Sequence, residues 1–129
     1  MIEGYLEKAA RKLAVAERLL AAGDFDDAVS RAYFAAFHAA QALLLTEGQR
    51  AETHRGLVTL FGLLLVKPGK IGIRFGRFLA NLKDDREAGD YEAFSFVDEG
   101  KARLALDEAR AFLTEARRYL AALPGTARS

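Results

Sequence analysis

The chain has no cysteine and no tryptophan, and only two histidines and two prolines among its 129 residues. The lack of cysteine excludes a disulfide scaffold and a thiolate metal site. No apolar run is long enough for a membrane span, since the longest, residues 57–66, is interrupted by Gly62 and has about half of the roughly 20 residues required. A signal-like apolar segment is also lacking. We therefore expect a cytoplasmic protein that does not enter a membrane.

Charge of one sign is not in excess either, because the net charge is only +1. Nonspecific nucleic-acid-binding proteins usually carry a strong positive excess, so any such binding here must be local. One stretch in the second half of the chain is locally basic, with glycines and aromatics between the cations. These cations are Lys67, Lys70, Arg74, Arg77, Lys83 and Arg86. A solvated surface loop is the simpler interpretation of such a run.

The apolar residues recur at three- and four-residue spacing over most of the chain, which predicts helices. The first helix is expected from Ile2 to Ala22, and it stops at Gly23. The second is expected to start after an Asp24 N-cap and to continue to about Glu47. The short turn between them makes the two helices antiparallel neighbours.

The second predicted helix is apolar on almost every side. One row of its apolar residues is Ala28, Ala32, Ala35, Ala39 and Leu43, and another is Val29, Tyr33, Phe37, Ala40 and Leu44. A helix that is apolar all round is buried, so we expect the central helix of a bundle or a helix covered by a second subunit. A homodimer formed through this helix or its neighbours is the resulting hypothesis.

Further helices are predicted downstream. Thr53 caps a third helix that ends before Lys67, a short glycine-broken helix covers residues 71–82, and residues 83–94 are expected to form a turn or loop. Ser95 and Asp98 have the spacing of a capping box that opens the last helix. The prediction is a single all-α domain over residues 1–123, an antiparallel four-helix-type bundle with an additional short helix, followed by a flexible tail at 124–129.

The second helix contains one arginine and one histidine, Arg31 and His38, in otherwise apolar, alanine-rich surroundings. A spacing of seven residues is close to two turns, so the two side chains lie on one helix face, about 10 Å apart along the axis. Such a pair is either a structural network or a functional site. In the structural interpretation, Arg31 pairs with an acid such as Asp90, and His38 is a hydrogen-bonded core histidine.

Three stretches of the chain resemble, in order and spacing, the signature stretches of one branch of the HEPN domain family. They are Arg-Ala-Tyr-Phe-Ala-Ala-Phe-His at 31–38, Thr-His-Arg-Gly at 53–56 and Asp-Arg-Glu-Ala-Gly-Asp-Tyr at 85–91. The resemblance covers roughly residues 3–122 and implies a small helical domain. The family includes partners of minimal nucleotidyltransferases and metal-independent ribonucleases, whose motif is an arginine followed within two helical turns by a histidine.

In the ribonuclease branch, the resemblance makes Arg31 and His38 the catalytic residues. Cleavage of RNA by its own 2′-hydroxyl requires a proton acceptor, a proton donor and a cation, which histidine and arginine supply at neutral pH. A two-fold dimer that brings both copies of His38 to one cleft would provide an acid and a base. The chain departs from the ribonuclease pattern where polar residues usually stand, with alanine at positions 32, 39 and 40.

The remaining predicted site residues are candidates for ligand binding. The structural alternative is a surface histidine near a helix cap for His54, and a loop anchored by a salt bridge of Arg86 or Asp90. His54 and Arg55 stand at the start of the third helix, where free backbone N–H groups favour an anion. The complete predicted ligand-binding set is Tyr33, His54, Arg55, Arg86, Asp90 and Tyr91. No cofactor is expected and no metal site, since the two histidines are far apart in sequence and no ligand-spaced acids share a helix with them.

Two functions remain open at this point. The resemblance implies a nucleotide- or partner-binding module that acts with a separately encoded minimal nucleotidyltransferase in a toxin–antitoxin system. The alternative is a metal-independent ribonuclease toxin that uses Arg31 and His38 at a dimer cleft. With either function, RNA or a nucleotide is the expected ligand.

Overall fold

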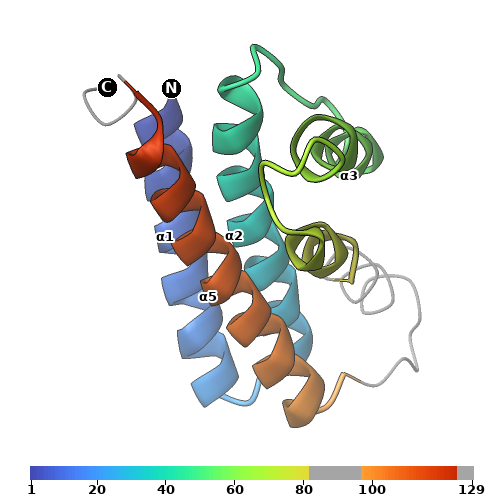
Figure 1. The fold of residues 1–129 in the computed structure, drawn as a ribbon. Helices are drawn as coiled ribbons and strands as arrows, with labels where there is room; N and C mark the ends of the chain where they lie inside the picture. Colours follow the sequence, from blue (N-terminus) through green and yellow to red (C-terminus); the bar gives the residue numbers. More distant parts are fainter. Residues whose placement is uncertain (82–96, 125–129) are drawn as a thin grey trace.

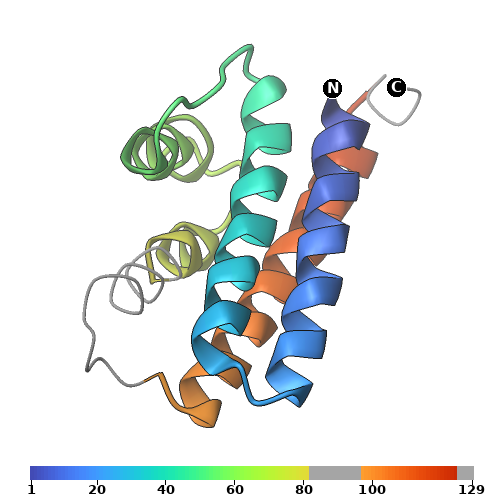
Figure 2. The same ribbon diagram turned by 180° about the vertical axis from the view of Figure 1, so that it is seen from behind.

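The computed structural model describes residues 1–81 and 97–124 and is all-α over these residues. Three long helices lie side by side: α1 (Ile2–Ala21), α2 (Phe25–Leu45) and α5 (Glu99–Ala122). Figure 1 shows α1 running antiparallel to α2, whereas α5 runs in the same direction as α2. The same arrangement is seen from behind in Figure 2. The first residues of α2 and of α5 therefore lie at the same end of the bundle.

Helix α1 and the short connection from α1 to α2 form as the sequence predicts. Helix α1 buries Leu6, Ala9, Leu13 and Ala16, one residue per turn on the face toward its neighbours. Gly23 follows with a φ of 84°, a left-handed conformation that glycine adopts without steric cost. Asp24 occupies the N-cap position of α2, but its side chain accepts no capping hydrogen bond, so its predicted capping role is wrong in this respect.

Helix α2 is the centre of the fold, with α1 and α5 on one side and the crosswise segments of the middle of the chain on the other (Figure 1). It buries twelve of its 21 residues, and seven of these are alanine, whose small side chains let the neighbouring helices approach closely. Burial of α2 is thus achieved within one chain. Its apolar character alone does not require a second subunit, which removes the premise on which the dimer was predicted.

A short helix, α3 (His54–Phe61), crosses α2 and continues directly as a π-helical segment, η1 (Gly62–Val66). Thr53 caps α3 as predicted, because its Oγ1 accepts a hydrogen bond from the Gly56 backbone N–H at 2.9 Å. In η1 the Lys67 N–H donates to the Gly62 carbonyl at 2.8 Å, an i to i+5 bond. The predicted third helix is therefore confirmed, although its last turn is wider than an α-helix.

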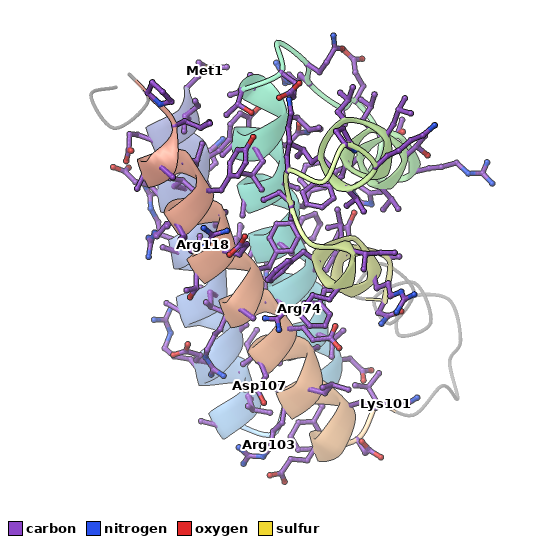
Figure 3. The ribbon with its side chains drawn as sticks, viewed as in Figure 1. Met1, Arg74, Lys101, Arg103, Asp107 and Arg118 are labelled. Atoms are coloured by element: carbon purple, nitrogen blue, oxygen red, sulfur yellow. The ribbon has the colours of Figure 1, made fainter. Side chains whose placement is uncertain are left out.

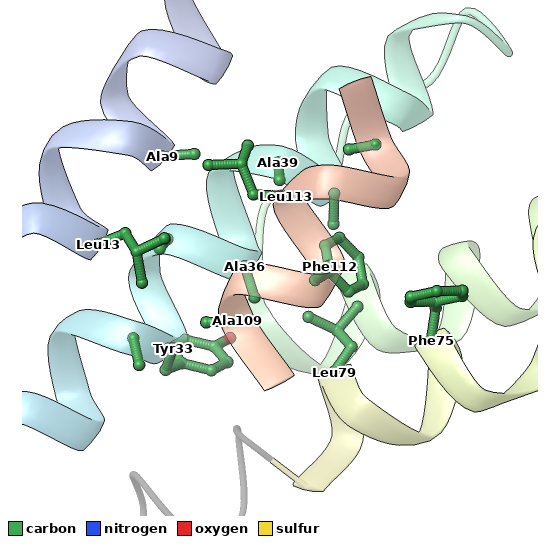
Figure 4. Close-up of a cluster of buried hydrophobic side chains, with 14 of the residues drawn as sticks. Ala9, Leu13, Tyr33, Ala36, Ala39, Phe75, Leu79, Ala109, Phe112 and Leu113 are labelled. Atoms are coloured by element: carbon green, nitrogen blue, oxygen red, sulfur yellow. The ribbon is translucent and has the colours of Figure 1, made fainter. Parts of the chain in front are cut away.

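A further helical segment over residues 73–81 packs beside α3 and η1, where a short helix was predicted. The buried cluster in Figure 4 joins all layers: Tyr33 and Ala36 of α2, Leu79 and Phe75 of the 73–81 segment, and Phe112 of α5. The Phe112 ring lies 5.3 Å from that of Phe61 and 6.3 Å from that of Phe75. The core is continuous across the molecule.

The last helix begins later than predicted. The N-cap of α5 is Asp98, whose carboxylate accepts a hydrogen bond from the Lys101 N–H at 2.8 Å. Ser95, the predicted cap, lies outside the described residues, and the capping function belongs to the acid three residues later. Within residues 1–81 and 97–124, no helix is both long and apolar enough to cross a bilayer.

Candidate functional site

His38 lies at the surface of α2 that faces α1, and its ring is half-buried. The ring stacks on Tyr5 of α1, with centroids 6.2 Å apart and planes inclined by 24°. The adjacent Phe37 ring meets it edge-on at 5.7 Å. Its Nδ1 atom is buried and has no hydrogen-bond partner among the described residues. A buried polar atom without a partner is uncommon in a native structure. Because Nδ1 is enclosed by protein, only the other side of the ring can meet a ligand.

The surroundings of His38 keep the imidazole neutral. Burial lowers the pKa of His38 from its ordinary value of 6.5, and the positive charges of Lys8 and Lys12 on α1 lower it further. The neutral form of the ring, in which one nitrogen can accept a proton, is therefore favoured at pH 7.

Two hollows adjoin His38, and both include the side chain of Lys8. The first, of ≈ 490 Å³, is lined by Lys8, Arg11, Lys12, Val15 and His38. The second, of ≈ 370 Å³, is lined by Tyr5, Lys8, Phe37, His38, Gln41, Arg50, Ala51 and Glu52. Cations outnumber acids in both linings. The exposed side of His38 thus opens onto a locally positive surface, although the whole chain is nearly neutral.

A buried amide fixes the wall of the second hollow. The Gln41 Nε2 donates to the Ala51 carbonyl at 2.7 Å, and the Ala51 N–H donates to the Gln41 Oε1 at 3.1 Å. Both groups are almost fully buried. This paired hydrogen bond holds the connection between α2 and α3 against α2, and so places Arg50 and Glu52 beside His38.

Arg31 lies on α2 seven residues before His38 and is exposed. It makes no hydrogen bond or ion pair with another described residue. Neither hollow beside His38 extends to Arg31. Its predicted partner Asp90 lies outside the described residues. The two predicted catalytic side chains thus share a helix, but no hollow formed by the described residues contains both.

His54 packs against the aromatic residues of α2. Its ring centroid lies 5.0 Å from that of Tyr33, 6.0 Å from that of Phe34 and 5.1 Å from that of Phe37. Tyr33 itself is fully buried, which argues against direct contact between this residue and a ligand. Arg55 is exposed. The Phe37 ring touches both histidines, so the Thr-His-Arg-Gly stretch supports the same region of α2 as His38.

Other residues singled out in the sequence lie outside the described residues or in the basic stretch. Arg86, Asp90 and Tyr91 fall outside the described residues. In the basic stretch, Lys70 pairs with Glu47 at 2.7 Å, and the Arg74 guanidinium, labelled in Figure 3, lies 4.6 Å from the Phe75 ring centroid. No group of three histidine, aspartate or glutamate side chains with metal-site geometry occurs in the part of the chain that the structure describes.

The residues of α1 and of the loop after α2 that surround His38 were not predicted from the sequence. Lys8 and Lys12 are four residues apart on a helix predicted to be antiparallel to the helix of His38, and this spacing was a usable signal. Gln41, a polar residue in an apolar helix, was a second signal, since a buried amide requires partners. Nothing in the sequence around Arg50 indicated that it would lie beside His38.

The chain is similar in sequence and in fold to several known proteins. A protein of Methanocaldococcus jannaschii named "Putative toxin MJ0605" is 34% identical over 119 residues, which are 92% of this chain and 88% of that protein. A protein of Thermotoga maritima named UPF0332 protein is 31% identical over 88% of this chain and 86% of its own length. The crystal structure of TT1696 from Thermus thermophilus has the same fold, with a TM-score of 0.77 at 24% identity over 92% of this chain and 98% of that one. The HEPN domain family model matches residues 2–119, and the chain therefore belongs to the HEPN domain family.

Proposed function

We propose that this protein is a metal-independent ribonuclease of the toxin type, active as a homodimer, with His38 as the proton-transfer residue and Arg31 as a charge-stabilising residue. The observation that carries the proposal is the place of His38: a half-buried imidazole with a lowered pKa that lines two hollows in which cations outnumber acids. The sequence relatives named as toxins support the same class of function.

The proposed reaction is transesterification within the RNA chain. Neutral His38 takes the proton of a 2′-hydroxyl, the 2′-oxygen attacks the adjacent phosphorus, and the bond to the 5′-oxygen of the next nucleotide breaks. The products are a 2′,3′-cyclic phosphate and a 5′-hydroxyl, whose oxygen receives a proton from the imidazolium of His38 of the second subunit. Arg31 stabilises the charge that develops on the phosphorane oxygens.

The two copies of His38 must differ in protonation for this reaction. Burial, and then the charges of Lys8 and Lys12, lower the pKa of His38 in the free protein, which suits the base. A bound phosphate offsets these two charges and raises the pKa of a nearby imidazole, which suits the acid. Because Arg31 and His38 lie seven residues apart on α2, the proposal requires a two-fold axis that places each Arg31 near the partner's histidine.

The second candidate is a binding module that docks a minimal nucleotidyltransferase and controls it without cleaving RNA. The observation that favours it is the apolar replacement of the positions around the motif. Ala32, Ala39 and Ala40 are all 0% exposed, so none of these three positions supplies a polar group to assist catalysis. In a toxin–antitoxin system, the same nucleotidyltransferase would be the partner that holds a ribonuclease in check in the cytoplasm. Binding of this protein to a minimal nucleotidyltransferase is therefore part of both proposals.

The deciding experiment is an RNA cleavage assay with purified protein in EDTA. The ribonuclease proposal predicts cleavage of single-stranded RNA to 2′,3′-cyclic phosphate ends, and a loss of about 10²-fold or more in His38→Ala. Arg31→Ala should also lose most activity, whereas Arg77→Ala, which removes another arginine outside the site, should keep it. Absence of cleavage on varied RNAs, combined with binding to the nucleotidyltransferase that depends on Arg31 or His38, would establish the second candidate instead.

Light scattering tests the dimer separately. The ribonuclease proposal requires a mass of two chains at the concentrations used for the assay. A monomer of 14.1 kDa that still cleaves RNA would remove the shared pair of histidines from the mechanism.

A further inference from the structure

Helix α1 carries a row of cations along the edge that faces His38. Lys8, Arg11 and Lys12 recur at three- and four-residue spacing, which places them on one face of the helix. All three line the first hollow together with His38, and Lys8 also lines the second. The cations therefore extend from one side of the histidine to the other.

Opposite charges reduce this positive surface only in part. Glu7 pairs with Arg11 at 3.5 Å, with both side chains well exposed, so the pair is weak. Lys8 and Lys12 form no ion pair with a described acid, and Lys8 instead lies 5.9 Å from the Tyr5 ring centroid. The lining of the second hollow includes one acid, Glu52, together with Lys8 and Arg50. Two lysines are thus available to an anion.

The two hollows differ in chemistry. The first contains cations and the aliphatic Val15, and of the aromatic rings only that of His38. The second contains the rings of Tyr5 and Phe37 beside Arg50, a combination of aromatic face and guanidinium on which an unpaired base can stack. Each volume is within the range of small-molecule sites, so each can accept about one nucleotide.

We propose that the two hollows bind consecutive nucleotides of a single strand of RNA, with Lys8 and Lys12 on the backbone phosphates and Tyr5 under a base. The scissile phosphate then lies at His38, between the two hollows. The identity of the polymer as RNA rests on the proposed ribonuclease function. The substrate is accordingly a polynucleotide with an unpaired base beside the cleaved bond, and a mononucleotide occupies only one half of the site.

The test is the salt dependence of binding to a fluorescein-labelled 2′-O-methyl oligouridylate of ten nucleotides, which lacks the hydroxyl needed for cleavage. Fluorescence anisotropy gives the dissociation constant at several salt concentrations. For single strands, the steepness of log K against log salt decreases by about 0.7 for each phosphate that the protein no longer neutralises. Lys8→Gln and Lys12→Gln should each reduce the slope by about that amount. Lys101→Gln is the matched control, because Lys101 is exposed at the end of the bundle opposite Met1 (Figure 3) and should leave the slope unchanged.

A second pair of variants tests the stacked base. Tyr5→Ala should weaken binding about tenfold, the order expected when one base loses its aromatic stacking partner, without changing the salt slope. Tyr5→Phe keeps the ring and should bind as the wild type does. Thermal melting of each variant confirms that the fold is retained.

Unchanged salt slopes in both lysine variants, or an equal reduction in Lys101→Gln, would overturn the inference. Uridine monophosphate that competes as strongly as the ten-nucleotide strand would overturn it as well. Binding does not depend on turnover, so the outcomes separate from those of the cleavage assay. If the protein does not cleave RNA but shows the predicted salt slopes, the ribonuclease proposal is wrong and the strand-binding site is supported. If it cleaves RNA but neither lysine variant changes cleavage or the salt slope, the ribonuclease proposal is supported and the strand-binding site is wrong.

Discussion

Replacement of Gln41 by leucine tests how the wall of the site is held. The side chain is 3% exposed and forms both hydrogen bonds of a buried pair with the backbone of Ala51, which is 5% exposed. Leucine has a similar size but cannot pair, so the Ala51 N–H and C=O both remain buried without a partner. An unsatisfied buried group costs about 1–3 kcal/mol, and the gain from burying a more apolar side chain offsets part of this. The expected loss in free energy of unfolding is about 2–4 kcal/mol.

Urea unfolding followed by far-UV circular dichroism measures this loss. With a slope of about 2 kcal/mol/M, the midpoint should fall by about 1–2 M. Gln49→Leu is the matched control, since Gln49 is exposed in the same connection and its side chain makes no hydrogen bond with a described residue. Surface substitutions of this kind change stability by no more than about 0.5 kcal/mol. A loss in Gln41→Leu that is no larger than in the control would refute the argument that this amide anchors the loop.

Three further predictions follow from the same structure. Phe112→Ala should lower the free energy of unfolding by about 3–5 kcal/mol in urea titrations, because the ring is 2% exposed and packs between two other phenylalanines. Gly56→Ala and Thr53→Ala should each cost about 1 kcal/mol and should not add in the double variant, because a Cβ at Gly56 would lie 2.9 Å from the capping Thr53 Oγ1. For His38, whose pKa is lowered in the folded state, the unfolded chain binds its proton first as the pH falls. Its stabilising contribution is therefore complete above pH ~6.5 and is lost below it. The free energy of unfolding of the wild type should fall relative to that of His38→Gln between about pH 7 and 5, and an NMR titration that gives His38 an ordinary pKa of 6.5 would contradict this.

Because the residues of the site also pack against one another, a substitution of His38 changes both stability and activity. His38 contacts α1 through Tyr5 and the α3 region through Phe37, so His38→Ala alters packing as well as chemistry. Lys8 and Lys12 act on the imidazole through charge, and their glutamine variants leave the packing of its ring intact. A change in the pH dependence of cleavage on Lys8→Gln, with unchanged melting, is therefore the cleaner evidence that the cationic surface controls the pKa of His38.

Local sequence signals determined the helices. Apolar spacing located α1, α2 and the helix after Thr53, because the side chains that a helix buries recur with its own period. The turn at Gly23 and the Thr53 cap were also readable, since both depend on residues within a few positions of one another. The start of α5 was not predicted correctly, because two acceptors three residues apart, Ser95 and Asp98, compete for the same role and the local pattern does not rank them.

Pairing between helices was decided only by the tertiary structure. The sequence predicted that α1 and α2 are antiparallel neighbours, but not the rotation and register that set Lys8, Lys12 and Tyr5 against His38. Nor did it show that α2 is covered within one chain, since the apolar pattern is the same whether helices or a second subunit provide the cover. The histidine itself was visible in the sequence. Its lowered pKa arises from burial and from charges about thirty residues away in the chain, and periodicity carries no information about contacts of that range.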